Sequence, residues 1–318
     1  MAADTLLTAV RAHLQLQPDH TVILEPIKKG ASGRTIVRLK AEGHPPFIGI
    51  HYTMEREDNR FFLPVAHFLK KSRLNVPEVL YDNQGRHIAL VEDLGDKDLL
   101  SLGDEPWETR EPYYRSALEQ LDRLFYTRVP KALELSPPFG PEAYAWEQDY
   151  FIDNLVEKHL GLDGEDLRKG DELTRLSNNL GSSHRNLIHR DFQSQNLIIH
   201  EGKTWIIDFQ GLRLGRQEYD LASLIYDPYL NHSEEDQNRL LDLWEEISEE
   251  RPVPELLRDC ATQRLMQALG AYAYLLHEQG LDWYKQYIPA AAKLLMTQIA
   301  ETPLETLLRP ALEAAMEK

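Results

Sequence analysis

Several features that mark other protein classes are scarce in this sequence of 318 residues. It contains one cysteine, Cys260, which excludes an internal disulfide framework and favours a reducing compartment, by default the cytoplasm. No apolar run is long enough to span a bilayer, and no basic segment followed by an apolar core opens the chain. We therefore expect a cytoplasmic protein without a membrane partner.

Basic residues are also few, and several catalytic motifs are missing. The 35 lysines and arginines face 52 acidic residues, for a net charge of −17, which argues against a nucleic-acid partner because phosphate backbones need a basic face. Neither a Walker-A stretch nor Gly-x-Ser-x-Gly occurs, which disfavours P-loop nucleotide binding and an α/β-hydrolase. Histidines and the one cysteine do not pair at zinc-ligand spacings.

The residues that are present predict an α+β protein with two lobes. A helix is expected over residues 5–15, and antiparallel strands over 22–27, 35–39, 47–52, 76–81 and 87–91. The composition then turns helical, so we expect a small sheet lobe over residues 1–94 and a larger, mainly helical lobe over 95–318. Helical spacing is evident over residues 59–72, 106–127, 142–160, 166–178, 258–278, 283–300 and 304–316, whereas 211–216 is predicted to be a loop.

The strongest chemical signal is the order Asp191, Asn196, Asp208. Two apolar strands, residues 197–199 and 204–207, flank a polar turn and predict a β-hairpin, with two of the polar residues before it and Asp208 after it. Closing that hairpin should bring the three side chains to one end. A carboxylate at position 191 can orient an acceptor hydroxyl or take its proton, while Asn196 and Asp208 offer hard oxygen ligands for Mg²⁺. This combination suits phosphoryl transfer. The alternative to a catalytic site is that these three polar residues merely cap turns beside the hairpin.

Two segments of the sheet lobe could bind a nucleotide. Gly30, Ser32 and Gly33, followed by Arg34, form a glycine-bearing turn between two strands, where the backbone can approach phosphates and Ser32 can donate a hydrogen bond. An ordinary hairpin loop would have the same composition. Backbone groups around Glu92 and Leu94, at the expected lobe boundary, could meet an adenine edge, although a plain interdomain connector is an equal alternative.

One helix of the second lobe mixes rings and carboxylates. Trp146, Asp149 and Tyr150 would suit a sugar, or a cationic acceptor, although a solvated acidic face with aromatic core residues is the commoner arrangement. Near the main signal, His189 is better placed for packing and hydrogen bonding than for catalysis. Arg190 either pairs with an acid or is an ordinary surface arginine.

Taken together, these stretches resemble the aminoglycoside phosphotransferase/choline kinase family, and most closely its anomeric sugar kinases for N-acetylmuramate and N-acetylglucosamine. The resemblance runs from about Gly30 to Leu224 and includes His189-Arg190-Asp191, Asn196, Ile207-Asp208-Phe209 and Tyr219-Asp220-Leu221. It implies a bilobal protein-kinase-like fold that binds ATP and Mg²⁺, with Asp191 as catalytic base and Asn196 and Asp208 as metal ligands.

The chain departs from the wider pattern at two places. The third strand has Gly49, Ile50 and His51 where a protein kinase would carry a lysine, which leaves Lys28, Arg34 and Arg38 as candidate cations for the phosphates. Gln193 and Gln195 stand where the sugar kinases have histidine and arginine, so the acceptor is the less determined part of the resemblance.

We therefore expect an ATP- and Mg²⁺-dependent small-molecule kinase that phosphorylates a sugar hydroxyl. The preferred acceptor is the anomeric hydroxyl of N-acetylmuramate or N-acetylglucosamine, as in the recycling of cell-wall sugars, and Gln193, Gln195, Trp146, Asp149 and Tyr150 are candidate contacts. A choline, homoserine or aminoglycoside kinase is the enzymatic alternative, and a nucleotide-binding pseudokinase is the non-catalytic one. The sequence leaves the oligomeric state and the choice of ATP over GTP open.

Overall fold

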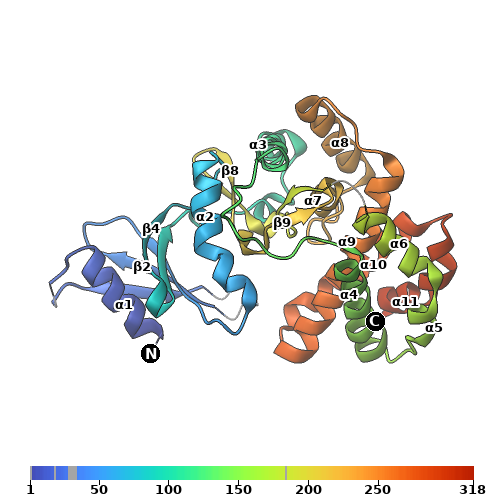
Figure 1. Ribbon diagram of the computed structural model, residues 1–318, viewed down its shortest axis with the longest axis horizontal. Helices are drawn as coiled ribbons and strands as arrows, with labels where there is room; N and C mark the ends of the chain where they lie inside the picture. Colours follow the sequence, from blue (N-terminus) through green and yellow to red (C-terminus); the bar gives the residue numbers. More distant parts are fainter. Residues whose placement is uncertain (1, 18, 28–33, 183–184) are drawn as a thin grey trace. The chain divides into compact units, whose positions relative to one another are not determined.

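The computed structural model describes residues 2–17, 19–27, 34–182 and 185–318. The chain forms two compact units, each with its own packing (Figure 1). The sheet unit comprises Met1–Lys97, Val129–Ser136 and Ile198–Gly211, and the helical unit comprises Asp98–Arg128, Pro137–Leu197 and Leu212–Lys318. The chain thus passes between the units more than once.

An antiparallel sheet with the strand order β1-β2-β3-β5-β4 forms the centre of the sheet unit. Its strands are β1 (Val22–Pro26), β2 (Thr35–Ala41), β3 (Phe47–His51), β4 (Val79–Asn83) and β5 (Ile88–Glu92). Along β2 the side chains alternate, with Val37 and Leu39 buried and Arg38 on the opposite face, as the two-residue period of a strand requires. The sheet therefore has one apolar face and one polar face.

Helix α1 (Ala2–His13) covers the apolar face of this sheet (Figure 1). Leu6, Ala9 and Val10 of the helix pack against Val37, Leu39, Phe47, Ile88 and Leu90. Gly49 of β3 lies beneath this contact, because a Cβ atom there would stand 2.5 Å from Leu39 Cδ1 and 3.2 Å from Leu6 Cδ2. The glycine at this strand position thus leaves room for α1 to pack on the sheet.

A β-hairpin and the helix that follows β3 complete the sheet unit. The predicted hairpin is present as β7 (Leu197–His200) and β8 (Lys203–Ile206), followed by the 3₁₀ turn η6 (Phe209–Gly211). Asn75 fixes β8 because its carbonyl accepts from Ile206 N at 2.8 Å and its amide nitrogen donates to Thr204 O at 3.1 Å. The remaining elements are η1 (Glu57–Phe61), α2 (Phe62–Lys71) and η2 (Gln84–Arg86).

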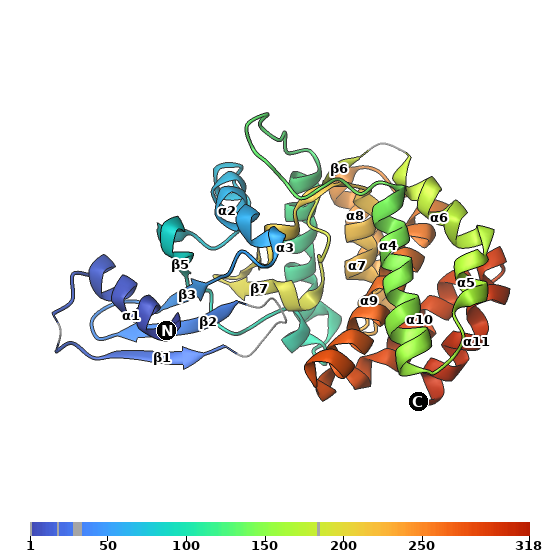
Figure 2. The same cartoon turned by 60° about the horizontal axis from the view of Figure 1, so that its bottom comes forward.

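Helix α9 (Pro254–Gln279) is the axis of the helical unit, and it packs against α4, α7 and α10 (Figure 2). Gly270 allows a close crossing with α4, since a Cβ atom there would lie 2.9 Å from Tyr150 O and 3.0 Å from Phe151 Cα. The other helices are α3 (Trp107–Phe125), α4 (Pro141–Phe151), α5 (Glu165–Lys169), α6 (Asp171–Gly181), α7 (Gln217–Ile225), α8 (Glu234–Ser248), α10 (Ile288–Ile299) and α11 (Pro303–Glu317).

Short elements connect these helices. They are the 3₁₀ turns η3 (Leu100–Leu102), η5 (Ser194–Asn196) and η7 (Asp282–Tyr287), the π-helical turn η4 (Ile152–His159), and the strands β6 (Asn186–Ile188) and β9 (Arg213–Gly215). Within the described ranges, no helix is long and apolar enough to cross a membrane.

The expected α+β class is confirmed, and the structure corrects two details. Residues 211–216 were predicted as a loop, but Arg213–Gly215 forms β9 and pairs antiparallel with β6. Three-residue strands carry too little alternation to be recognised, and this pairing joins distant parts of the chain. The single helix predicted over residues 166–178 is divided into α5 and α6 at Gly170, whose backbone is extended (φ −65°, ψ 125°).

Candidate active site

Side chains hold the backbone that leads to Asp191, in the helical unit. The buried carboxylate of Asp220, in α7, accepts hydrogen bonds from the backbone N–H groups of His189 (2.5 Å) and Arg190 (2.8 Å). The next N–H group, that of Asp191, donates to Nδ1 of the buried His189 ring at 3.2 Å. Three successive N–H groups are therefore bonded to side chains, which fixes the start of residues 189–196. We call this segment the catalytic loop after the role expected of Asp191.

The loop backbone is also conformationally unusual at Arg190, where φ is 83°. A positive φ at a large non-glycine residue costs free energy, and such strain persists only where the surroundings enforce it. The two hydrogen bonds to Asp220 are the enforcing contacts. Burial raises the pKa of Asp220 to about 7, and the His189 and Arg190 N–H groups limit the rise because they stabilise the anion.

Asp191 and Asn196 are brought together by the loop itself. The Asn196 amide nitrogen donates to the backbone carbonyl of Asp191 at 2.9 Å, and the same carbonyl accepts from Gln193 N at 2.9 Å. The Asn196 N–H group donates in turn to Gln193 O at 2.9 Å. These local bonds close the 3₁₀ turn η5 and leave the Asp191 side chain 32% exposed.

Positive charges surround the Asp191 carboxylate. Desolvation by the surrounding protein atoms raises the pKa of Asp191. The positive charges of Arg190 and Arg264 lower it by more, so the pKa of Asp191 lies below its ordinary value. Arg264, from α9, places Nη2 3.5 Å from Asp191 Oδ1. Asp191 is therefore ionised at neutral pH, so it can accept a hydrogen bond from a hydroxyl group.

The predicted acceptor residues of the loop have different surroundings. Gln193 Oε1 accepts from Arg264 Nη2 at 2.8 Å, and Gln195 is partly exposed within η5. Ser194, between them, is buried, and its N–H group donates to the buried carboxylate of Asp227 at 2.8 Å. Gln193 thus belongs to the polar network around Asp191.

Helix α4 contributes one buried carboxylate in addition to its exposed acidic residues. Glu147 is 1% exposed, accepts from Tyr219 Oη at 3.0 Å, and lies 3.7 Å from the Arg190 guanidinium. Burial raises the pKa of Glu147, while Arg190 lowers it. Arg190 is therefore paired with an acid, which was one of the two expected arrangements.

The other candidates on α4 lie near a different part of α9. Trp146 is 56% exposed and stacks on Tyr150, with ring centroids 5.2 Å apart and planes inclined by 12°. Tyr150 also contacts Tyr274 of α9 at 5.8 Å, and Asp149 is exposed beside them. Since a helix rises about 1.5 Å per residue, Tyr274 lies roughly 15 Å along α9 from Arg264. Tyr150 therefore contacts α9 about ten residues beyond Arg264, which is the α9 residue that contacts Gln193 and Asp191.

In the sheet unit, Asp208 lies next to Arg34. The Arg34 side chain is 4% exposed and that of Asp208 is 43% exposed, with Nη1 and Oδ1 separated by 3.9 Å. Arg34 also donates to Asn59 Oδ1 at 2.7 Å and Gln210 Oε1 at 3.1 Å. Asp208 Oδ1 accepts from Gln210 Nε2 at 2.7 Å, and its φ of 62° is a second strained position.

Aromatic packing connects Asp208 and Arg34 to helix α2. Phe209 is buried and stacks on Phe62, the first residue of α2, with ring centroids 5.7 Å apart and an interplanar angle of 3°. The Arg34 guanidinium lies over the same Phe62 ring, 5.1 Å from its centroid. The aromatic pair therefore supports both the carboxylate and the cation of this group.

The connector after β5 is held by Arg38. Its guanidinium contacts Asp93 at 2.5 Å and Asp96 at 2.8 Å. Glu92 N donates to Glu78 O at 2.9 Å, and Leu94 O is 3.2 Å from His200 Nδ1. Arg38 therefore stabilises the segment that contains the predicted adenine contacts. Gly30, Ser32, Gly33 and the candidate cation Lys28 lie outside the described residues.

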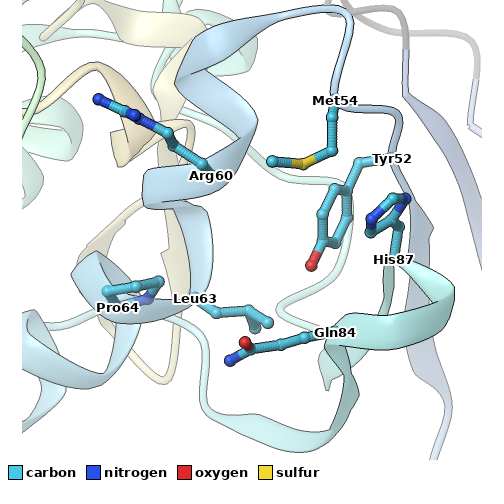
Figure 3. Close-up of a pocket in the computed structure, with 7 residues that line it drawn as sticks. All are labelled: Tyr52, Met54, Arg60, Leu63, Pro64, Gln84 and His87. Atoms are coloured by element: carbon cyan, nitrogen blue, oxygen red, sulfur yellow. The ribbon is translucent and has the colours of Figure 1, made fainter.

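The sheet unit also has a cavity of about 230 Å³ near the end of β3 and the start of α2. Figure 3 shows Tyr52 beside His87 in its wall, and their ring centroids are 5.5 Å apart. Met54, Arg60, Leu63, Pro64 and Gln84 line the rest of the cavity. None of its lining residues is one of the predicted site residues.

Sequence reasoning missed three residues that organise the catalytic loop: Glu147, Asp220 and Arg264. In the sequence, Asp220 is only part of the family resemblance, and Glu147 and Arg264 lie within predicted helices without a predicted role. A charged residue among apolar neighbours on a predicted helix, as at position 264, was the available signal.

Known proteins are similar to this chain over most of its length. A relative from Pseudomonas aeruginosa, named N-acetylmuramate/N-acetylglucosamine kinase, is 25% identical over 295 residues, spanning 88% of this chain and 85% of the relative. A relative of the same name from Neisseria meningitidis serogroup B is 28% identical over 247 residues, spanning 71% of this chain and 72% of the relative.

Solved structures establish the fold independently. A choline/ethanolamine kinase family protein from Mesorhizobium loti matches with a TM-score of 0.63 at 15% identity, covering 100% of both chains. The ADP-bound aminoglycoside phosphotransferase APH(2'')-Ib matches with a TM-score of 0.57 at 15% identity, covering 91% of this chain and 97% of that one. These similarities confirm the fold that the resemblance implied. The model of the phosphotransferase enzyme family matches residues 23–257 of the 318, and the chain therefore belongs to that family.

Proposed function

We propose that the protein is an ATP- and Mg²⁺-dependent kinase that transfers the γ-phosphoryl group to the anomeric hydroxyl of N-acetylmuramate or N-acetylglucosamine. The observation that carries the proposal is the ionised Asp191, held in a loop that also positions Asn196. The names of the two relatives support the choice of acceptor. Use of ATP as donor fits the expected cytoplasmic location.

Asp191 acts on the acceptor hydroxyl. Because its pKa is lowered, the carboxylate is a weak base at neutral pH, and its main contribution is to orient the hydroxyl in line with the γ-phosphate. As the new O–P bond forms, the bond between the γ-phosphorus and the oxygen that bridges it to the β-phosphate breaks and ADP leaves, while the proton passes from the hydroxyl to Asp191 Oδ. Holding the reacting groups in line lowers the barrier by removing translational and rotational freedom.

Asn196 and Asp208 are the proposed Mg²⁺ ligands, and their chemistry fits the ion. The amide nitrogen of Asn196 is bonded to Asp191 O, so the amide oxygen is on the opposite side of the group. Asp208 offers a half-exposed carboxylate. Amide and carboxylate oxygens are the ligands that Mg²⁺ takes in proteins. When bound, the ion would neutralise charge on the phosphates.

Arg34 is the proposed replacement for the absent strand lysine. Its guanidinium is permanently charged, is buried next to Asp208, and follows directly on the turn that contains Gly30, Ser32 and Gly33. We assign that turn to the phosphates. Arg38 is less suitable because two carboxylates hold it. The remaining backbone groups of the connector, around the Glu92 carbonyl and the Leu94 N–H group, are proposed to meet the adenine.

Gln193 and Gln195 are the proposed acceptor contacts, and Trp146, Asp149 and Tyr150 are second candidates. The stacked pair of Trp146 and Tyr150 beside an acidic residue favours one alternative, a cationic acceptor of the choline, homoserine or aminoglycoside type. The two functions differ in their acceptors alone.

An acceptor panel tests the proposal. ATP consumption is measured with N-acetylmuramate, N-acetylglucosamine, choline, homoserine and kanamycin, with wild-type protein and Asp191→Asn. We expect turnover with the amino sugars and a loss of at least 100-fold in Asp191→Asn. Turnover with choline, homoserine or kanamycin alone would favour the alternative function, and undiminished turnover in Asp191→Asn would remove Asp191 from the mechanism.

A further inference from the structure

Arg264 is a buried cation, and its N–H groups donate to side chains of the catalytic loop and of the helices α7 and α9. The residue is 6% exposed, in the middle of α9. Its Nε donates to Ser223 Oγ at 2.8 Å, its Nη1 to Gln267 Oε1, and its Nη2 to Gln193 Oε1 at 2.8 Å. Burying a guanidinium is costly unless such partners compensate it.

The loop itself has no positive charge between Asp191 and Asn196, where the sequence is Phe192-Gln193-Ser194-Gln195. Arg264 Nη2 lies 3.5 Å from Asp191 Oδ1 and so supplies a cation from a helix far along the chain. Burial lowers the pKa of Arg264, but Asp191 and other nearby groups raise it further, so the guanidinium stays charged. Arg264 also lies beyond residue 257, where the match to the family model ends.

We propose that Arg264 is a positioning residue for phosphoryl transfer, which fixes the side chains of Asp191 and Gln193 relative to each other. This inference rests on the proposed function. The guanidinium of Arg264 is planar, and its hydrogen bonds to Ser223 of α7 and Gln267 of α9 fix the orientation of that plane. One Nη2 group then faces both Gln193 Oε1 and Asp191 Oδ1.

The orientation of Gln193 follows from this contact. Because the amide oxygen is bonded to Arg264, the amide nitrogen of Gln193 is the part of the group that remains to meet a ligand. Gln193 thus acts as a donor toward the acceptor. The acceptor class that this arrangement recognises carries an oxygen acceptor, such as an amide carbonyl or a carboxylate, close to the hydroxyl that Asp191 orients.

The test compares Arg264→Gln, Arg264→Lys, Gln193→Ala and the double variant Arg264→Gln/Gln193→Ala. We measure kcat and KM for ATP and for N-acetylglucosamine, and the hydrogen exchange of the 189–196 segment. Arg264→Gln is expected to lower kcat/KM for the sugar about 100-fold with little change in KM for ATP, because misplacement of a reacting group by about 1 Å costs that much. Arg264→Lys should recover part of the loss, since it restores the charge without the planar fork.

Two further results separate positioning from general loosening of the unit. The double variant should be no worse than Arg264→Gln alone, because Arg264 acts partly through Gln193, and a Gln193 side chain that Arg264 no longer orients contributes little. Exchange in the 189–196 segment should rise in Arg264→Gln. The matched control is Gln148→Met. Gln148 is buried, and its amide nitrogen donates to Leu173 O at 3.1 Å and to Gln263 Oε1 at 3.0 Å. The substitution should lower stability and leave kcat/KM within about threefold of the wild-type value.

The proposal is overturned if folded Arg264→Gln keeps kcat/KM within threefold of wild type, or if the Arg264 and Gln193 effects multiply independently. If Arg264→Gln does not fold, Arg264→Lys and Gln193→Ala carry the same test, and equal activity of both with wild type overturns it. Absence of turnover in the wild-type protein with every acceptor would count against the proposed function instead. In that case, hydrogen exchange of the 189–196 segment still measures the effect of Arg264 on the loop.

Discussion

Asp220→Asn is the substitution for which the structure makes the most specific forecast. The carboxylate of Asp220 accepts from two successive N–H groups, at 2.5 and 2.8 Å. An asparagine oxygen can accept from one of them, but its NH₂ group then faces the other N–H group. Hydrogen bonds to a charged group contribute about 1.5–3 kcal/mol each, so the expected loss in the free energy of unfolding is about 3 kcal/mol.

The effect on activity follows from the strained backbone at Arg190, whose φ is 83°. Without both bonds to Asp220, this backbone relaxes and Asp191, the next residue, moves. A displacement of about 1 Å at a reacting group costs roughly 100-fold in rate. We therefore expect kcat of Asp220→Asn to fall by about two orders of magnitude at pH 8, where the carboxylate of the wild type, with a pKa of about 7, is ionised.

The assay combines denaturant unfolding with steady-state kinetics of ATP turnover on N-acetylglucosamine. Asp236→Asn is the matched control because its carboxylate pairs with Arg110 at 2.7 Å, on α3 and away from the loop. It should lose stability and keep kcat. Full activity in a folded Asp220→Asn protein would refute the claim that Asp220 sets the catalytic loop.

Four other substitutions test separate parts of the structure. Arg34→Met should raise KM for ATP about tenfold or more. Arg38→Met should chiefly lower stability, because it leaves the Asp93 carboxylate buried without its cation. Kinetics and thermal unfolding of both variants test these expectations. Gly270→Ala should cost about 1–3 kcal/mol in denaturant unfolding, since its Cβ would meet the α4 backbone at 2.9 Å. His232 is buried and its pKa is lowered to about 4, so it is neutral in the fold but takes up a proton in the unfolded chain below its ordinary pKa of about 6.5. Stability should therefore fall by up to about 3 kcal/mol between pH 6.5 and 4, and unfolding measured across that range should show a weaker pH dependence in His232→Gln.

The sequence predicted the elements that have a strong local period. The hairpin over β7 and β8, the sheet strands and the long helices all have apolar spacing that identifies them. The pairing of β6 with β9 escaped prediction because three residues carry too little alternation.

For the candidate site, the sequence identified residues that are close together in the chain. Asp191, Gln193 and Asn196 lie in one loop, and their mutual hydrogen bonds follow from local turn formation. Asp220 and Arg264 act on the same loop from 29 and 73 positions beyond Asp191, and no local period relates them to it. Their contribution depends on how α7 and α9 pack in the helical unit, which is a property of the tertiary structure.

The most direct test of the central claim is phosphorus NMR of the product formed from ATP, Mg²⁺ and N-acetylglucosamine or N-acetylmuramate. The proposed function predicts a phosphomonoester on the anomeric carbon, formed by the wild-type protein and absent with Asp191→Asn. Release of inorganic phosphate alone, or equal product formation by Asp191→Asn, would contradict it.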